Sequence, residues 1–214
     1  MKKISFKTDD NVVIVGNFWK GSSNAVLLLH MMPATKESWT EFANLLNKNN
    51  FTVLAIDLRG HGESTNQNGE ILNFRQFSDK QHQGTIKDVY AAVDYLKNSG
   101  AKEVYIAGAS IGANLALQYQ AENQDIKKTI MMSAGLNYRG VLTEQFASKL
   151  NMEQSVFLIV GSRDDSADEM ARQIANKIKG TKKVKIYESS SHGTDLFNDD
   201  KKLGNEMLDW LKGF

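Results

Sequence analysis

The 214-residue sequence contains no cysteine and a single proline, and its charges almost cancel. Without cysteine, the chain has no disulfide bonds, no thiolate zinc site and no cysteine nucleophile. Its 26 basic and 25 acidic residues leave a formal net charge of +1, so we expect neither nucleic acid nor an anionic membrane surface as a partner. The apolar run at residues 25–29 is far too short to span a bilayer.

The chain also shows no targeting segment and no linker. Residues 1–10 contain a basic pair, but polar residues follow and no apolar signal-peptide segment is present, so we expect a cytoplasmic protein. One α/β domain over residues 1–214 is the simplest organisation at this length. No group of carboxylates and histidines has metal-ligand spacing, so we predict neither a metal nor a cofactor. The sequence leaves the oligomeric state open.

Apolar strand patterns alternate with helical patterns along the chain. Patterns typical of strands occupy residues 3–8, 12–19, 25–29, 51–56, 103–107, 129–132, 156–160 and 184–187. The first two flank turn residues and predict an antiparallel edge hairpin, whereas amphipathic helical faces separate the later ones. This alternation predicts an α/β fold with a mainly parallel central sheet and helices on both faces. Ser38 and Ser166, each followed three residues later by glutamate, predict capping boxes at two helix starts.

A Gly-X-Ser-X-Gly motif at residues 108–112 stands between a strand pattern and a helix pattern. In such a turn, Gly108 and Gly112 leave room for a strained backbone, and the hydroxyl of Ser110 projects above the sheet. The Ile111 N–H at the helix start has no intrahelical partner and points where an oxyanion could form. A chance match has odds of roughly one in ten for a chain of this length. The interpretation of Ser110 as a nucleophile therefore depends on its context.

That context is the edge of the sheet at which parallel strands end, where ligands bind in such folds. The side chains that follow the fifth, seventh and last strand patterns include Ser110, Asp164, Asp165 and His192. A serine, a carboxylate and a histidine thus share one edge in the chain order Ser, Asp, His. A serine hydroxyl is a weak nucleophile that requires a base, and histidine suits that task near neutral pH. Either aspartate could orient the histidine.

The remaining polar residues at these strand ends are interpreted as structural. We expect His30 and His61 to organise their own loops, and His82 to be a solvated residue near a helix start. Asp57 and Arg59 are expected to hold neighbouring loops through charge-assisted hydrogen bonds.

Together these motifs resemble those of small α/β-hydrolases without a lid, and in this small size the chain is similar to dienelactone hydrolases. The matching segments are residues 57–64, 108–112, 161–164 and 192–193, and the resemblance extends over nearly the whole chain. It implies an α/β-hydrolase fold without a large cap domain. It also implies a serine hydrolase in which Ser110 is the nucleophile and His192 the general base, with Asp164, three residues after Gly161, as the acid. The motifs are specific for the superfamily and not for a substrate.

Two positions depart from the pattern of the family. Dienelactone hydrolases use a cysteine where this chain has Ser110. The loop after the third strand often reads His-Gly in the family, but here it reads His30-Met31-Met32 and is bulkier. By resemblance, the oxyanion hole combines the backbone N–H of Ile111 with that of Met32, with Met31 as the alternative donor.

Only residues 134–154 separate the sixth and seventh strand patterns, which is too short for a full cap domain. We therefore expect an open mouth, an apolar pocket that includes Met31, Leu136 and Tyr138, and a small-molecule substrate. The predicted reaction is the hydrolysis of carboxylic esters or thioesters with small to medium acyl groups through a seryl acyl-enzyme. A lactone hydrolase or a peptidase would use the same machinery, and a non-catalytic ligand-binding or regulatory protein would keep the same fold.

Overall fold

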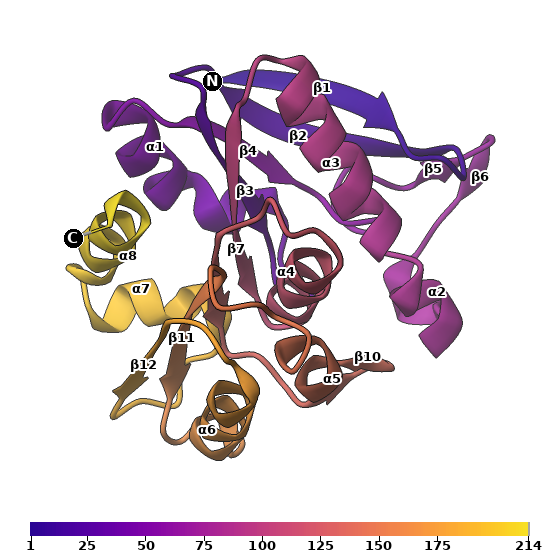
Figure 1. The fold of residues 1–214 in the computed structure, drawn as a ribbon. Coiled ribbons are helices and arrows are strands. Elements are labelled where there is room, and N and C mark those ends of the chain that lie inside the picture. Colours follow the sequence, from indigo (N-terminus) through magenta and orange to yellow (C-terminus); the bar gives the residue numbers. More distant parts are fainter. Residues whose placement is uncertain (214) are drawn as a thin grey trace.

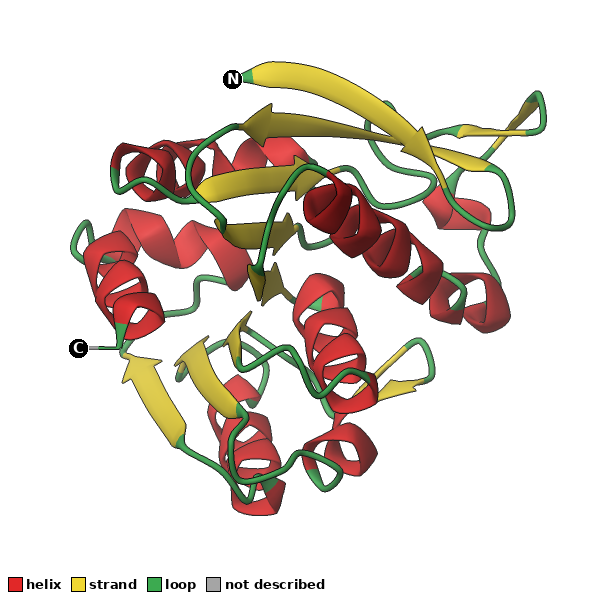
Figure 2. Cartoon of the chain, turned by 45° about the horizontal axis from the view of Figure 1, so that its top comes forward, coloured by secondary structure: helices red, strands yellow, loops and turns green. Residues whose placement is uncertain are grey.

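The computed structural model describes residues 1–213 of the chain. One large sheet crosses the molecule, and helices cover both of its faces (Figure 1, Figure 2). Its strands lie in the order β12-β11-β8-β7-β3-β4-β2-β5-β6, and β1 pairs with β2. The strands are β1 (Lys2–Lys7), β2 (Val12–Trp19), β3 (Asn24–Leu29), β4 (Thr52–Ile56), β5 (Asn66–Gln67), β6 (Glu70–Ile71), β7 (Glu103–Ala109), β8 (Lys128–Met132), β9 (Asn137–Tyr138), β10 (Val141–Leu142), β11 (Ser155–Gly161) and β12 (Lys182–Tyr187).

Helices and single 3-10 turns connect these strands. The helices are α1 (Thr40–Lys48), α2 (Asp79–Gln83), α3 (Ile86–Asn98), α4 (Ile111–Glu122), α5 (Thr143–Ala147), α6 (Ala167–Lys177), α7 (Leu196–Asp199) and α8 (Leu203–Lys212), and the 3-10 turns are η1 (Lys36–Trp39), η2 (Phe74–Gln76) and η3 (Gly193–Asp195). The strands from β12 to β4 in the sheet order run parallel, whereas β1, β2, β5 and β6 pair antiparallel. The predicted α/β fold, with a mainly parallel sheet and an antiparallel N-terminal edge, is confirmed.

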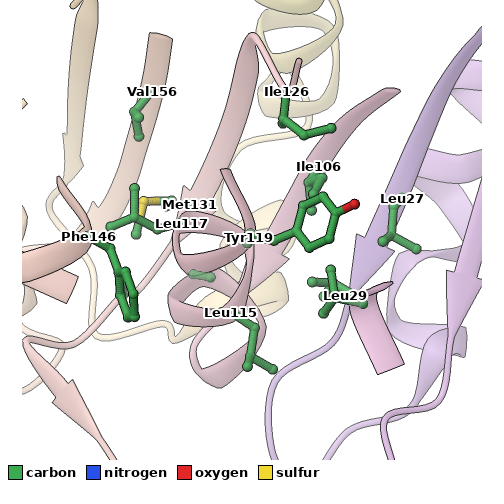
Figure 3. Packing of buried hydrophobic residues seen from close by; sticks show 14 of the residues in the cluster. Leu27, Leu29, Ile106, Leu115, Leu117, Tyr119, Ile126, Met131, Phe146 and Val156 are labelled. Atoms are coloured by element: carbon green, nitrogen blue, oxygen red, sulfur yellow. The ribbon is translucent and has the colours of Figure 1, made fainter. Parts of the chain in front are cut away.

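The central strands are buried on both faces because each face is covered by its own layer of helices. Leu27 and Leu29 of β3 belong to one core cluster, which packs against α3, α4, α5 and α6, and Figure 3 shows them beside side chains of α4. Val26 and Leu28 point the other way, into a second cluster formed with α1, α7 and α8. Alternation along an extended strand thus gives each core half of the apolar side chains, and the polar ends of the strands remain for the site.

The two predicted capping boxes are wrong. Ser38 lies inside η1 and its hydroxyl makes no hydrogen bond, because the chain enters this region through a 3-10 turn before α1 begins. Ser166 does precede α6, but its backbone is left-handed (φ 61°) and its side chain makes no capping bond. A capping box forms instead between Ser78 and Gln81 at the start of α2, in a segment for which the sequence predicts no helix.

No large cap covers the strand ends. Between β8 and β11 the chain forms the two-stranded β9-β10 hairpin and the single short helix α5, as the length of this segment predicts. Within residues 1–213, no helix is long and apolar enough to cross a membrane.

Candidate active site

Ser110 occupies a sharp turn between β7 and α4. Its backbone has φ 52° and ψ −118°, a conformation that costs a non-glycine residue about 1–3 kcal/mol. Gly108 and Gly112 let the start of α4 pack closely against the strand ends. A Cβ on Gly112 would lie 2.5 Å from the carbonyl oxygen of Leu29, and a Cβ on Gly108 would collide with the Gly112 carbonyl. The Ser110 N–H donates to the Met132 carbonyl at 2.8 Å. The turn is therefore fixed against the ends of both neighbouring strands.

His192 and Asp164 meet on loops that follow the adjacent strands β12 and β11. Each carboxylate oxygen of Asp164 lies 2.9 Å from Nδ1 of His192. The two loops are bound together, since the Arg163 N–H donates to the Ser189 carbonyl at 2.9 Å. Asp165 has a left-handed backbone (φ 40°) and is exposed. The structure thus places Asp164, and not Asp165, against the histidine.

Ser110 and His192 are brought to the same place through their chain neighbours. A Cβ on Gly193 would lie 3.2 Å from the Cβ of Ala109, so the residue after the histidine lies next to the residue before the serine. The His192 side chain is 41% exposed and Ser110 is 2% exposed. No hydrogen bond joins their side chains within residues 1–213. Catalytic hydrogen bonds are often long in enzymes without substrate and tighten only in the complex.

The loop after β3 approaches the start of α4, and His30 holds its backbone. The His30 Nδ1–H donates to the Met31 carbonyl at 2.8 Å, and the Leu58 N–H donates to Nε2 of His30 at 2.9 Å. Burial lowers the pKa of His30, which keeps the ring neutral and able to accept. The expectation that His30 organises this loop is confirmed. Among the described residues, the N–H groups of Met31, Met32 and Ile111 all donate no hydrogen bond to protein.

A buried lysine fixes the far end of the same loop. Lys36, whose side chain is 3% exposed, pairs with Asp57 at 2.7 Å and with Glu37 and Glu63 at 3.1 Å each. Asp57 also accepts the backbone N–H groups of Lys36 and Glu63 at 2.9 Å. Burial lowers the pKa of Lys36, but the hydrogen bonds that its ammonium donates to the carboxylates outweigh this effect, and the net direction of the pKa is up. The prediction for Asp57 is confirmed, whereas no sequence pattern pointed to Lys36, because lysines are mostly exposed.

Arg59 and His61 hold the turn after β4 from inside. Arg59 donates to Asp88 from its backbone and its side chain at 2.8 Å, and to Asp10 at 2.8 and 3.0 Å, as predicted. His61 stacks on Phe74 and donates from Nδ1 to the Arg59 carbonyl. Burial, reinforced by a neighbouring imidazole, lowers the pKa of His61 to about 4.

The expectation of a solvated His82 is wrong. This residue is only 4% exposed and meets the ring of Phe77 edge to face. It lies within α2, a short helix that packs its histidine inward, and the sequence offered no periodic signal because five residues are too few for one.

The three residues predicted for an acyl pocket pack against different cores. Met31 packs on the α1 side of the sheet with its sulfur at Gly193, whereas Leu136 and Tyr138 pack on the α4 side. A cavity of about 540 Å³ lies between α1 and α7, and none of the three residues lines it. Their common pocket stays a prediction. Within residues 1–213, no group of three or more histidine, aspartate or glutamate side chains is placed to hold a metal.

Comparisons with known proteins identify the family and the fold. Residues 24–164 match the model of a family described as alpha/beta hydrolase fold. Over 116 residues the chain is 28% identical to the AB hydrolase superfamily protein YisY of Bacillus subtilis, a match that covers 53% of this chain and 39% of that protein. The match thus spans less than half the length of this relative.

Solved structures share the fold over nearly the whole chain. The esterase Pf2001 of Pyrococcus furiosus superposes with a TM-score of 0.79 at 20% identity, over 99% of this chain and 91% of that one. The enol-lactonase of Burkholderia xenovorans gives a TM-score of 0.79 at 14% identity, over 98% of this chain and 100% of that one. At these identities the likeness shows the fold alone.

Proposed function

This chain belongs to the alpha/beta hydrolase fold family, and on that premise we propose that it is a serine hydrolase that cleaves carboxylic esters or thioesters with small to medium acyl groups. One observation carries the proposal: Nδ1 of His192 lies 2.9 Å from both oxygens of Asp164, at the sheet edge where Ser110 occupies its strained turn. An orienting carboxylate, a histidine and a serine at one strand edge are the parts that acyl transfer requires.

Each residue has one role in the proposed cycle. Nε2 of His192 takes the Ser110 proton as Oγ attacks the substrate carbonyl, and Asp164 stabilises the imidazolium that forms. The N–H groups of Ile111 and Met32, with Met31 as the alternative, bind the oxyanion. His192 then returns the proton to the departing alcohol or thiol, and water repeats the sequence on the acyl-enzyme.

The substrate class follows from what covers the site. The segment between β8 and β11 holds only a two-stranded hairpin and a five-residue helix, so a long acyl chain would find little protein to enclose it. Small and medium acyl groups suit such an open mouth. The folds shared with an esterase and an enol-lactonase are consistent with this chemistry.

A fluorophosphonate probe tests the nucleophile. At neutral pH we expect one adduct, on Ser110, which is lost in Ser110→Ala and strongly slowed in His192→Gln. An intact protein without any adduct would overturn the proposal.

Nitrophenyl esters of graded chain length test the substrate class, together with matched thioesters. Hydrolysis should decline for long acyl chains, and activity that rises steadily with chain length would contradict the argument from the open mouth.

A further inference from the structure

Ser133 follows β8 directly and stands at the strand end between those of Ser110 and Asp164. It is only 3% exposed. Its hydroxyl accepts the backbone N–H of Gly193 at 2.9 Å, across sixty positions of the chain. This buried hydroxyl has no role in the reaction proposed above.

Three functional loops are joined at this point. The Ser110 N–H donates to the carbonyl of Met132, the residue before Ser133. The Ser133 N–H donates to the Ile159 carbonyl near the end of β11, the strand that leads to Asp164. The third link is the hydroxyl itself, which holds Gly193 beside the histidine.

The histidine loop has little freedom on its other side. Gly193 has φ 56°, and a Cβ there would lie 2.6 Å from the sulfur of Met31 and 3.2 Å from Ala109 Cβ. Gly193 is thus enclosed by the loop of the predicted oxyanion donor, by the strand of Ser110 and by Ser133. Of these contacts, the bond to Ser133 is the directional one, because a hydrogen bond fixes an angle as well as a distance.

The backbone conformation of Ser133 is a second sign that its side chain has a role. Its φ of 48° lies in the left-handed region, which glycine adopts without strain and which is strained for a residue with a Cβ. Backbone strain of this kind clusters at functional sites, and Ser133 combines it with burial and a hydrogen bond to the loop of His192.

We propose that Ser133 is a positioning residue, which holds the His192 loop over Ser110 through the Gly193 N–H. This inference rests on the proposed serine hydrolase and deepens it. The hydroxyl does not touch the reacting atoms. It acts by fixing the imidazole between Asp164 and Ser110, so its removal should lower turnover and leave substrate binding in place.

Two substitutions remove the hydroxyl with opposite effects on backbone strain. Ser133→Ala keeps the strained Cβ and Ser133→Gly relieves it, yet both should lower kcat about tenfold, the worth of one buried hydrogen bond, with KM nearly unchanged. Ser133→Gly should unfold at a higher temperature than Ser133→Ala.

Ser64→Ala is the matched control. Ser64 is also fully buried, and its hydroxyl accepts the Val15 N–H at the same 2.9 Å, but on the antiparallel side of the sheet. We expect this variant to lose stability comparable to that of Ser133→Ala and to keep both kcat and KM. If Ser133→Ala and Ser133→Gly also keep both, or if Ser133→Gly alone recovers full kcat, the proposal is overturned.

Amide hydrogen exchange at Gly193 separates this inference from the proposed function, since it requires no substrate. Exchange should accelerate at least tenfold in both Ser133 variants and stay unchanged in Ser64→Ala. Unchanged exchange at Gly193 would refute the anchor even in an active hydrolase. Faster exchange in a protein that hydrolyses no ester and labels with no probe would refute the proposed function and leave the anchor standing.

Discussion

Gly112→Ala offers the sharpest test of the turn that presents Ser110. The new Cβ would lie 2.5 Å from the Leu29 carbonyl oxygen and 2.8 Å from that of His30. Cβ contacts below 3.0 Å are essentially never seen, so the start of α4 must retreat by at least 3.0 − 2.5 = 0.5 Å. Both opposing atoms belong to the backbone of β3 and its loop, and neither can rotate away as a side chain would.

The magnitude can be set from this displacement. Overpacking of this kind costs about 1–3 kcal/mol, and at roughly 2–4 °C per kcal/mol for a chain of this size the midpoint of thermal unfolding should fall by about 2–12 °C. The Ile111 N–H moves with the helix, and misplacement by about 1 Å can cost about 10²-fold in rate. Activity should therefore fall far more than stability.

Gly204→Ala provides the control for helix propensity. Gly204 is likewise the second residue of its helix, α8, but the new Cβ would meet only the ends of the Leu45 and Phe42 side chains, at 3.2 and 3.6 Å. Thermal unfolding, the rate of Ser110 labelling by a fluorophosphonate and kcat/KM for a nitrophenyl ester should all stay near wild type in this control. If Gly112→Ala matches it in all three, the close approach of α4 to β3 has no functional consequence and the reasoning fails.

The aspartate of the proposed triad is tested by a pair of variants: Asp164→Asn should lower kcat by about 10³–10⁴-fold and Asp165→Asn by less than about twofold, and the opposite order would contradict the triad. Acid should weaken the fold through His61, because burial and a neighbouring imidazole lower its pKa to about 4. Below about pH 6.5 His61 therefore binds a proton in the unfolded chain but stays neutral in the native state. The free energy of unfolding falls by up to about 3 kcal/mol between pH 6.5 and 4. Urea unfolding at neutral and acidic pH measures this, and an equal fall in His61→Phe would rule it out. Lys36→Met should cost about 3–5 kcal/mol because it leaves a buried carboxylate unpaired. Lys87→Met, which breaks a surface pair, should cost less than about 1 kcal/mol by the same urea titration, and equal losses would show that burial of the pair is immaterial.

The sequence by itself determined the long strands of the sheet, most of the helices between them, and the chemical types of the residues at the strand ends. Helix α4 begins at Ile111, as the Gly-X-Ser-X-Gly motif before a helix pattern predicts, because a turn of this kind between a strand and a helix is specified by local sequence. Parallel strands end at one edge by topology, so the strand order along the chain was enough to gather Ser110, His192 and two candidate aspartates there.

What only the tertiary structure decided was which neighbours touch. Asp164, and not Asp165, lies 2.9 Å from His192, and adjacent residues of one type carry no sequence pattern that distinguishes them. The buried pairing of Lys36 with Asp57 and the bond from Gly193 to Ser133 join segments far apart in the chain. Hydrogen bonds and ion pairs act over about 3 Å, so they exist only once the fold has brought their partners together.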